Sequence, residues 1–430
     1  MTTTPQSPGS TPETAVPPPG PVLRHRGFQY LLAGAGASHI GTQIRLVALP
    51  LIAVTTFHVT PFQSGLLTAA ETAAFLLIGL PAGVWADRFR RRRILIAADI
   101  ARGLVILSLP VASFLGVLSL PHLYVVALLV GFGTVLFDVA HMSYVPQLVG
   151  RKRVVEAATR LEVVEFSATA GGPAAAGLLV QYLTAPFTLL VNAFSYAVSA
   201  LFLSRIRDDG KSPRADAAPG EPSRMWPDIK AGLAVVLRDP VLRPIALCGA
   251  VVQLFETGWL ALQPIFLIRQ IGLSSGGYGV LLAAGAIGGL LGAVLTPPIC
   301  RRFGTVRTLR ISLLMTFPFL LLPFAAPGWQ TVLYGIGTFL GMGASAIYNV
   351  TQIGIRQLAC PEHLLGRMNA TMRFVMWGVM PFGGILGGAL GSLFGVRAAL
   401  TVCLAGLLLA AVPIWLSSLR TMSDQGLAHA

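Results

Sequence analysis

The chain has 430 residues, of which 54% are hydrophobic and 11% are charged, and its formal net charge is +14. About a quarter of the residues in an ordinary soluble domain are charged, so this composition excludes a soluble globular protein. The positive charge does not indicate a nucleic-acid-binding protein, because the Lys and Arg residues lie between apolar segments and are not grouped with aromatic residues. We therefore expect a partner in the lipid bilayer and none among nucleic acids.

The sequence carries no recognisable signature of an enzyme. It has no G-x-x-x-x-G-K-[ST] loop for ATP and no Ser or Cys nucleophile within a motif that supplies a base. The four cysteines are isolated, without C-x-x-C spacing or neighbouring histidines: Cys248, Cys300, Cys360 and Cys403. The pattern predicts no metal site, no cofactor and no disulfide framework.

Apolar windows long enough to cross a bilayer dominate the chain. About 20 apolar residues span the hydrocarbon core as a helix, and lipid favours helices because their backbone hydrogen bonds are satisfied internally. In chain order the predicted spans are 28–56, 62–86, 94–117, 120–146, 160–183, 185–204, 241–269, 276–300, 307–326, 329–355, 365–392 and 397–419. The sequence therefore predicts an all-α integral membrane protein with twelve transmembrane helices.

Polar segments divide these spans into two six-helix halves. The predicted domains are a disordered, Pro- and Thr-rich tail without a signal peptide, an N-terminal half, a solvated cytoplasmic loop, a C-terminal half and a short tail. Their limits are 1–23, 24–204, 205–240, 241–420 and 421–430.

Most of the 31 Lys and Arg residues fall in segments that would share one side of the membrane. The other side receives Arg269 and Arg397, and the spans themselves contain Arg45, Arg102 and Arg373. By the positive-inside rule, we expect a multi-pass protein of the cytoplasmic membrane with both termini in the cytoplasm.

The two halves share a weak internal repeat. A shift of 214 positions matches Arg88-Phe89 with Arg302-Phe303, and both pairs follow the second span of their half. A shift of 210 positions matches Gln147-Leu148 with Gln357-Leu358. Parallel six-helix repeats are typical of transporters that rock two halves around a central site.

The segment Gly83–Arg93, GVWADRFRRRR, resembles the signature of the major facilitator superfamily between helices 2 and 3. In that signature a Gly is followed four residues later by an Asp-Arg pair and then by a basic run. Other stretches, such as Phe137–Ala140 and Gly366–Phe374, resemble the exporter branch that includes macrolide-efflux and enterobactin-export proteins. The resemblance extends over about residues 24–420 and implies the major facilitator fold.

The resemblance also implies a gate. Gly83, Asp87 and Arg88 would form the gating loop, in which the Asp faces the N-terminal end of helix 11 and releases it when the transporter changes state. The helix-5 motif of antiporters is matched by Gly171, Gly172 and Pro173.

This sequence departs from the family where antiporters commonly couple protons. Thr42 follows the helix-1 glycine, where an acid is common, and Asp138 lies in helix 4, where many relatives have Arg. We therefore assign candidate proton coupling to ionisable residues inside other spans, which are costly there and hence functional candidates. These candidates are Glu71, Glu256, Asp138 and Arg45.

Glu71 and Glu256 lie deep in their spans, as does Arg45. Burial favours the protonated form of a carboxyl group, whereas a nearby arginine favours the ionised form, so such an acid could take up and release a proton. The alternative is a fixed ion pair between Arg45 and Glu71. Asp99 and Arg102 are three residues apart on one helix face, and we expect them to form a structural ion pair.

Glu162 and Glu165 would lie at the start of span 5, where acids suit a helix N-terminus, so we expect capping or gate residues there. Amide and aromatic residues of several spans could line a cavity for a large amphipathic molecule, although each could equally be a packing residue. The candidates are Gln43, Trp259, Gln263, Tyr348, Asn349, Gln352, Phe374 and Trp377.

These features together predict a secondary active transporter that works by alternating access. The favoured function is proton-coupled antiport, with efflux of a drug, antibiotic or siderophore-like metabolite by a monomeric chain. The alternatives are an uptake permease of the same fold and a transport-inactive membrane sensor or assembly protein. Several intramembrane ionisable residues oppose the inactive alternative, since a passive scaffold has no use for them.

Overall fold

The computed structural model describes residues 22–150, 153–206, 233–234, 236–361 and 364–420, apart from a few side chains at Arg24, Leu80, Gly83–Val84, Ala86–Arg88 and Arg367. The predicted C-terminal tail, residues 1–21 of the predicted N-terminal tail and most of the predicted loop 205–240 lie outside these residues. Within the described part, twelve helical segments are long and apolar enough to cross a membrane, as the sequence predicts, and none of the structure is a strand.

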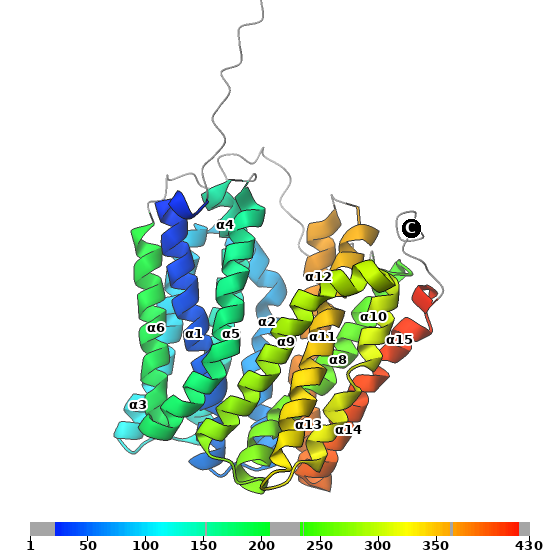
Figure 1. Cartoon of the computed structure of the whole chain (residues 1–430). Coiled ribbons are helices and arrows are strands. Elements are labelled where there is room, and N and C mark those ends of the chain that lie inside the picture. Colours follow the sequence, from blue (N-terminus) through cyan, green and yellow to red (C-terminus); the bar gives the residue numbers. More distant parts are fainter. Residues whose placement is uncertain (1–21, 151–152, 207–232, 235, 362–363, 421–430) are drawn as a thin grey trace, which may run out of the picture.

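The N-terminal half consists of six helices (Figure 1). They are α1 (Arg26–Thr55), α2 (Pro61–Arg88), α3 (Arg91–Phe114), α4 (Leu120–Val149), α5 (Val154–Leu183) and α6 (Ala185–Arg205). A short 3-10 turn, η1 (Val22–Arg24), precedes them. Most of these helices begin within three residues of the predicted span, whereas α5 begins at Val154 rather than 160, because its backbone hydrogen bonding continues past the apolar window.

The C-terminal half also has six spans, four of which change helical geometry along their length. The spans are α8 with η3 (Leu242–Pro264, Ile265–Gln270), α9 (Ser275–Phe303), α10 with η4 (Thr305–Leu314, Phe317–Phe324), α11 (Thr331–Ala359), α12 with α13 (Leu365–Trp377, Met380–Phe394) and α14 with α15 (Val396–Leu409, Ala411–Trp415). The chain closes with η6 (Ser418–Arg420).

Prolines account for three of these changes. The α-helices that end at Leu314, Trp377 and Leu409 are each followed, four residues later, by Pro318, Pro381 or Pro413. A proline ring clashes with the carbonyl group four residues before it and provides no N–H for that carbonyl. The α-helix therefore stops at the residue whose carbonyl loses its partner.

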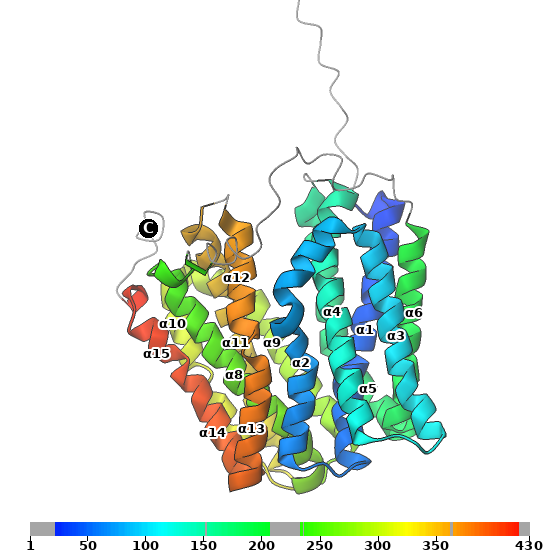
Figure 2. The same ribbon diagram turned by 180° about the vertical axis from the view of Figure 1, so that it is seen from behind.

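The second span of each half packs against the fifth span of the other half. Figures 1 and 2 show α5 beside α9 on one face and α2 beside α13 on the opposite face. Glycines make both seams close. A Cβ atom on Gly177 of α5 would lie 2.9 Å from the Cα of Gly279, and one on Gly65 of α2 would lie 2.8 Å from the Cα of Gly388. Only glycine permits such an approach of two helix backbones.

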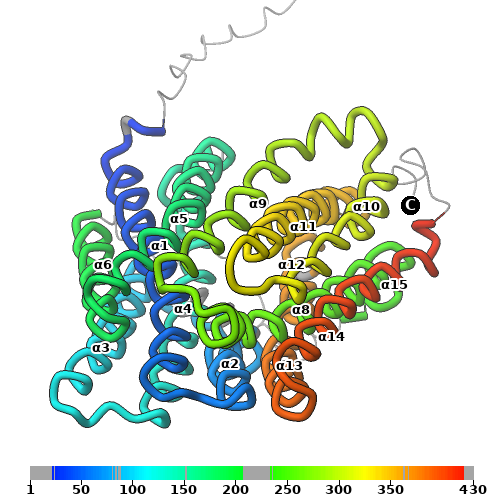
Figure 3. Tube along the Cα trace, turned by 60° about the horizontal axis from the view of Figure 1, so that its bottom comes forward, coloured from blue at the N-terminus to red at the C-terminus, as the bar shows by residue number. Residues whose placement is uncertain are grey.

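These seams lie at the end of the molecule opposite η1 and η6, which share the upper side in Figure 1. Polar contacts between the halves reinforce the same end. Arg269 of η3 donates hydrogen bonds to the carbonyl oxygens of Val54 and Val59 at 3.1 and 2.7 Å, and the hydroxyl of Ser64 donates to Ala261 O at 2.6 Å. The two halves, seen together in Figure 3, are therefore joined at the end remote from the termini.

The opposite end is less closed. On α5, positions 162, 165, 169, 176 and 180 share one face because an α-helix has 3.6 residues per turn. Ala176 and Val180, near the seam, are 0% and 6% exposed, whereas Glu162 and Glu165, nearer the termini, are exposed. The same helix face is thus sealed at one end of the molecule and accessible at the other, as α5 and α9 diverge toward the termini in Figure 1.

Candidate transport site between the two halves

Arg45 and Glu71 form an ion pair between α1 and α2. Arg45 Nη1 donates to Glu71 Oε1, and the two side chains are 8% and 14% exposed. Glycine lets α4 approach this position, because a Cβ on Gly131 would lie 2.6 Å from the carbonyl oxygen of Glu71. In this conformation the charges of Arg45 and Glu71 compensate each other inside the N-terminal half.

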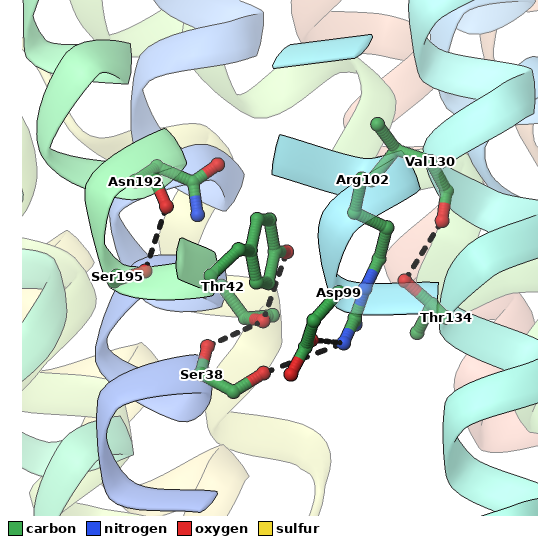
Figure 4. A network of polar contacts seen from close by, with 9 residues as sticks. Ser38, Thr42, Asp99, Arg102, Val130, Thr134, Asn192 and Ser195 are labelled. Atoms are coloured by element: carbon green, nitrogen blue, oxygen red, sulfur yellow. Dashed lines mark hydrogen bonds and ion pairs between the residues drawn. The ribbon is translucent and has the colours of Figure 1, made fainter. Parts of the chain in front are cut away.

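Asp99 and Arg102 form a second buried ion pair, drawn in Figure 4. The guanidinium carbon of Arg102 lies 4.5 Å from the ring centre of Phe137 and 4.4 Å from that of Tyr196. Such cation–π contacts stabilise a cation that is withdrawn from water. The pair and its aromatic neighbours link α3, α4 and α6, so the contact is internal to one half.

Thr42, where relatives commonly have an acid, belongs to the same network. Its hydroxyl donates to the carbonyl oxygen of Ser38 at 2.9 Å and lies 3.4 Å from the hydroxyl of Tyr196 (Figure 4). The neutral hydroxyl of Thr42 is thus accommodated by a backbone carbonyl group and the Tyr196 hydroxyl.

Glu256 differs from the two paired acids. It is half-buried near the middle of the span formed by α8 and η3, and it has no hydrogen bond or ion pair with any residue that the structure describes. Gly258 of α8 packs against Gly383 and Gly387 of α13. Glu256 is about 200° around the helix from Gly258, so it faces away from α13.

Asp138 and Arg373 approach each other from opposite halves. Arg373 of α12 donates to the Sδ atom of Met142 in α4 at 2.9 Å and lies over the ring of Trp377 at 4.3 Å. Asp138, one turn before Met142, interacts electrostatically with Arg373. Trp377 in turn meets Phe75 of α2 edge-to-face at 5.1 Å, so these residues bridge the halves at mid-depth.

The predicted cavity residues fall into two groups. Trp259, Gln263, Tyr348 and Gln352 are at most 5% exposed and pack inside the C-terminal half in this conformation. Gln263, for example, donates to the hydroxyl of Tyr334 at 2.8 Å.

The remaining four are accessible to different degrees. Phe374 and Trp377 are half-buried, and Asn349 is exposed on α11. Gln43, also half-buried, donates to the hydroxyl of Thr169 in α5 at 3.1 Å. In the sequence, the buried residues and the accessible residues look alike, because a polar or aromatic residue within a span does not show which neighbouring helix covers it.

The predicted gating loop is described in part, and the basic run that follows it is described in more detail. The side chains of Gly83, Asp87 and Arg88 lie outside the described residues, although the backbone of α2 is helical up to Arg88. The basic run that follows contacts the protein itself. Arg91 donates to Ser143 O at 3.0 Å and Arg92 to Leu203 O at 3.0 Å, so these cations bind carbonyl groups of α4 and α6.

The expected position of Glu162 and Glu165 at a helix start is wrong. Helix α5 begins at Val154, so Glu165 lies three turns inside it, because α5 continues through the polar residues before the apolar window. There Glu165 meets a residue that the sequence reading missed: His39 Nε2 of α1 lies 4.0 Å from Glu165 Oε2. A histidine in the middle of an apolar span was the signal for it.

The helical bundle, its two inter-half seams and its intramembrane charges define a membrane transporter rather than an enzyme. Residues 18–429 match the family described as transmembrane secretion effector, and the chain belongs to this family of the major facilitator superfamily.

Two curated relatives are exporters. The chain is 28% identical to the multidrug efflux pump Tap of Mycolicibacterium fortuitum, over 92% of this chain and 95% of Tap. It is 25% identical to the enterobactin exporter EntS of Salmonella choleraesuis, over 80% of this chain and 81% of EntS.

Solved structures confirm the fold. The nucleoside transporter NupG superposes with a TM-score of 0.72 at 12% identity, over 90% of this chain and 97% of that one. A bacterial homologue of the lysosomal transporter Spinster, in an inward-facing and occupied conformation, gives 0.71 at 17% identity, over 92% and 96%.

Proposed function

We propose that this chain is a proton-coupled exporter of the cytoplasmic membrane, with both termini in the cytoplasm. It would exchange inward proton flow for outward movement of an amphipathic organic molecule, such as a drug or a siderophore-like metabolite, and would do so as a monomer. The transporter class follows from family membership. The direction and the substrate class are supported by Tap and EntS, whose names describe export.

The observation that carries the proton coupling is Glu256, which has no hydrogen bond or ion pair with the residues that the structure describes. An acid at mid-depth without a partner is costly when ionised and becomes tolerable when it binds a proton. In the proposed cycle, the rocking of the halves would expose Glu256 to one side of the membrane and then to the other. Arg45–Glu71 would instead be a fixed pair that maintains the N-terminal half.

The seal remote from the termini supports the same cycle. With the termini in the cytoplasm, the described conformation is closed to the outside and accessible from the inside, which is the state that would receive a cytoplasmic molecule. Glu256 would release its proton in this state, and Asp138 with Arg373 would adjust as the halves close.

Accumulation of a chemically varied compound panel tests the function. We expect cells that produce the protein to accumulate less of at least one compound than cells without it, and a protonophore to abolish the difference. Higher accumulation would identify an uptake permease instead. Equal accumulation of every compound would contradict transport of this panel and favour the inactive alternative.

A further inference from the structure

The contact between His39 and Glu165 is a second titratable site, separate from Glu256. It joins α1 to α5, with 4.0 Å between His39 Nε2 and Glu165 Oε2. The two side chains are 31% and 52% exposed, whereas the side chains of Asp99 and Arg102 are 0% and 2% exposed. His39 and Glu165 therefore meet where the protein leaves them partly uncovered, on the face of α5 that leads to the seam with α9.

Several other charged or titratable groups surround this contact. They are Glu162 of α5, Asp138 and His141 of α4, Arg102 of α3, which is paired with Asp99, and Arg373 of α12, which interacts with Asp138. Among the described residues, Arg102 and Arg373 are balanced by Asp99 and Asp138, whereas Glu162 forms no ion pair, so the surroundings are negative when Glu162 is ionised.

The helix that faces this region from the other half is apolar. Between Ser275 and Cys300, α9 has no Asp, Glu, Lys, Arg or His. Gly177 of α5 contacts Gly279 of α9. Val294 is as many residues from Gly279 along α9 as Glu162 is from Gly177 along α5, so the two lie at similar distances from this contact. Val294 is 64% exposed. If the halves closed on this side, Val294 and its apolar neighbours would cover the acidic face of α5.

We propose that His39 and Glu165 form a proton-exchange site that controls this closure. Without a proton the pair has a net charge of −1, and with one proton it is neutral, whichever atom holds the proton. Covering a net charge with apolar surface costs far more than covering a neutral pair. Binding of a proton therefore favours the approach of α9 to α5, and loss of the proton favours the accessible state.

This inference deepens the proposed proton coupling and rests on the proposed rocking of the two halves. It can be tested without a transported molecule. A Val294→Cys variant, made with Cys300→Ser, is labelled with a membrane-impermeant maleimide in detergent between about pH 5.5 and 8.5, the range in which a histidine titrates. Val155→Cys, at the exposed start of α5, serves as the reference, because the ratio of the two rates cancels the pH dependence of thiol reactivity.

We expect the ratio of Val294→Cys to Val155→Cys labelling to fall several-fold as the pH falls. Adding His39→Gln and Glu165→Gln together should remove this fall, whereas Ser167→Ala, on the outer face of α5, should keep it. His39→Gln alone should move the midpoint to lower pH, because a carboxyl group then titrates in place of an imidazole. This single variant keeps the test decisive if the double variant does not fold.

A pH-independent ratio in the wild-type chain would overturn the inference, as would an unchanged fall in the double variant. The labelling ratio could instead lose its pH dependence with Glu256→Gln and keep it in the double variant. That result would also overturn the inference and would assign the response to Glu256. Failure of the proposed function is distinguishable, because it shows in the compound panel and not in the labelling ratio.

Discussion

At the scale of single residues, the intramembrane acids of this protein separate by the partners they have. Glu71 is paired with Arg45, and Asp99 is paired with Arg102. Glu256 has no partner among the described residues, and the partly exposed His39 is the one described residue that forms an ion pair with Glu165, at 4.0 Å. An acid with a permanent cation holds its charge, whereas an acid without one changes protonation at lower cost.

The first prediction concerns the buried pair in the N-terminal half. Glu71→Gln should destabilise the protein by about 3–5 kcal/mol, because it leaves Arg45 buried and uncompensated. Arg45→Met combined with Glu71→Leu should recover much of that loss. Thermal unfolding of the purified protein in detergent measures both effects. A stable Glu71→Gln variant that exports but no longer responds to a pH gradient would show that Glu71 is a coupling acid.

The second prediction concerns Glu256. Glu256→Gln should fold as the wild type does, because no hydrogen bond or ion pair with the described residues is lost. It should nevertheless abolish export driven by a pH gradient in proteoliposomes, while exchange of labelled for unlabelled compound continues. The compound is one that the panel identifies as exported. Unaltered pH-driven export in this variant would exclude Glu256 as the coupling acid.

At the scale of helices, glycine and proline decide how the spans meet and where they bend. Glycines occupy the seams where α2 meets α13 and α5 meets α9, and prolines end the α-helices at Leu314, Trp377 and Leu409. All three proline breaks lie in the C-terminal half. The N-terminal half has prolines within its helices, such as Pro173 of α5, but those helices continue without interruption.

The third prediction compares two glycines of α2. A Cβ on Gly65 would lie 2.8 Å from the Cα of Gly388, whereas a Cβ on Gly79 would have no atom within 4 Å. Gly65→Ala should therefore force α2 and α13 apart and increase labelling from the side remote from the termini. Gly79→Ala should leave access unchanged and stabilise the helix by about 0.5–1 kcal/mol.

To compare the two glycine variants, Ser392→Cys is added to each of them and the new cysteine is labelled. Ser392 accepts a hydrogen bond from the backbone N–H of Phe62 at 3.0 Å, across the seam. Equal labelling in Gly65→Ala and Gly79→Ala would show that the seam tolerates a methyl group and that the close approach does not seal this end.

At the scale of the whole molecule, the two halves are joined at one end, and the described ends of the chain lie at the other (Figure 1). Apolar side chains cover much of the outer surface, for example Phe114 at 80% and Phe194 at 69% exposure, as a lipid-facing surface requires. The basic residues at the ends of the helices give this apolar body its expected orientation.

The fourth prediction is the orientation itself. A fluorescent protein fused after Ala430 should be fluorescent, and alkaline phosphatase fused at the same place should be inactive, because we expect that end in the cytoplasm. A fusion placed between Gly328 and Gln330, in the connection between η4 and α11, should give the opposite results. Active phosphatase at the C-terminal fusion would reverse the orientation and the direction assigned to the open side.

The sequence by itself determined the features that depend on local chemistry. Spans appear as apolar windows because a membrane imposes hydrophobicity on each segment separately. The resemblance of the segment Gly83–Arg93 and of the exporter-like stretches identified the superfamily, which membership in the secretion effector family confirms. The pairing of Asp99 with Arg102 followed from their spacing on one helix, and the structure places them in contact.

Only the tertiary structure decided which partner each polar residue meets. Sequence spacing could not pair His39 with Glu165, because they belong to different helices and no local pattern encodes that distance. Nor could it bury Trp259, Gln263, Tyr348 and Gln352 while leaving Asn349 exposed, since all five have the same signal of polarity or aromaticity within a span. The state of each charge depends on its neighbours and on access to water, and both are properties of the packed helices rather than of the segments that form them.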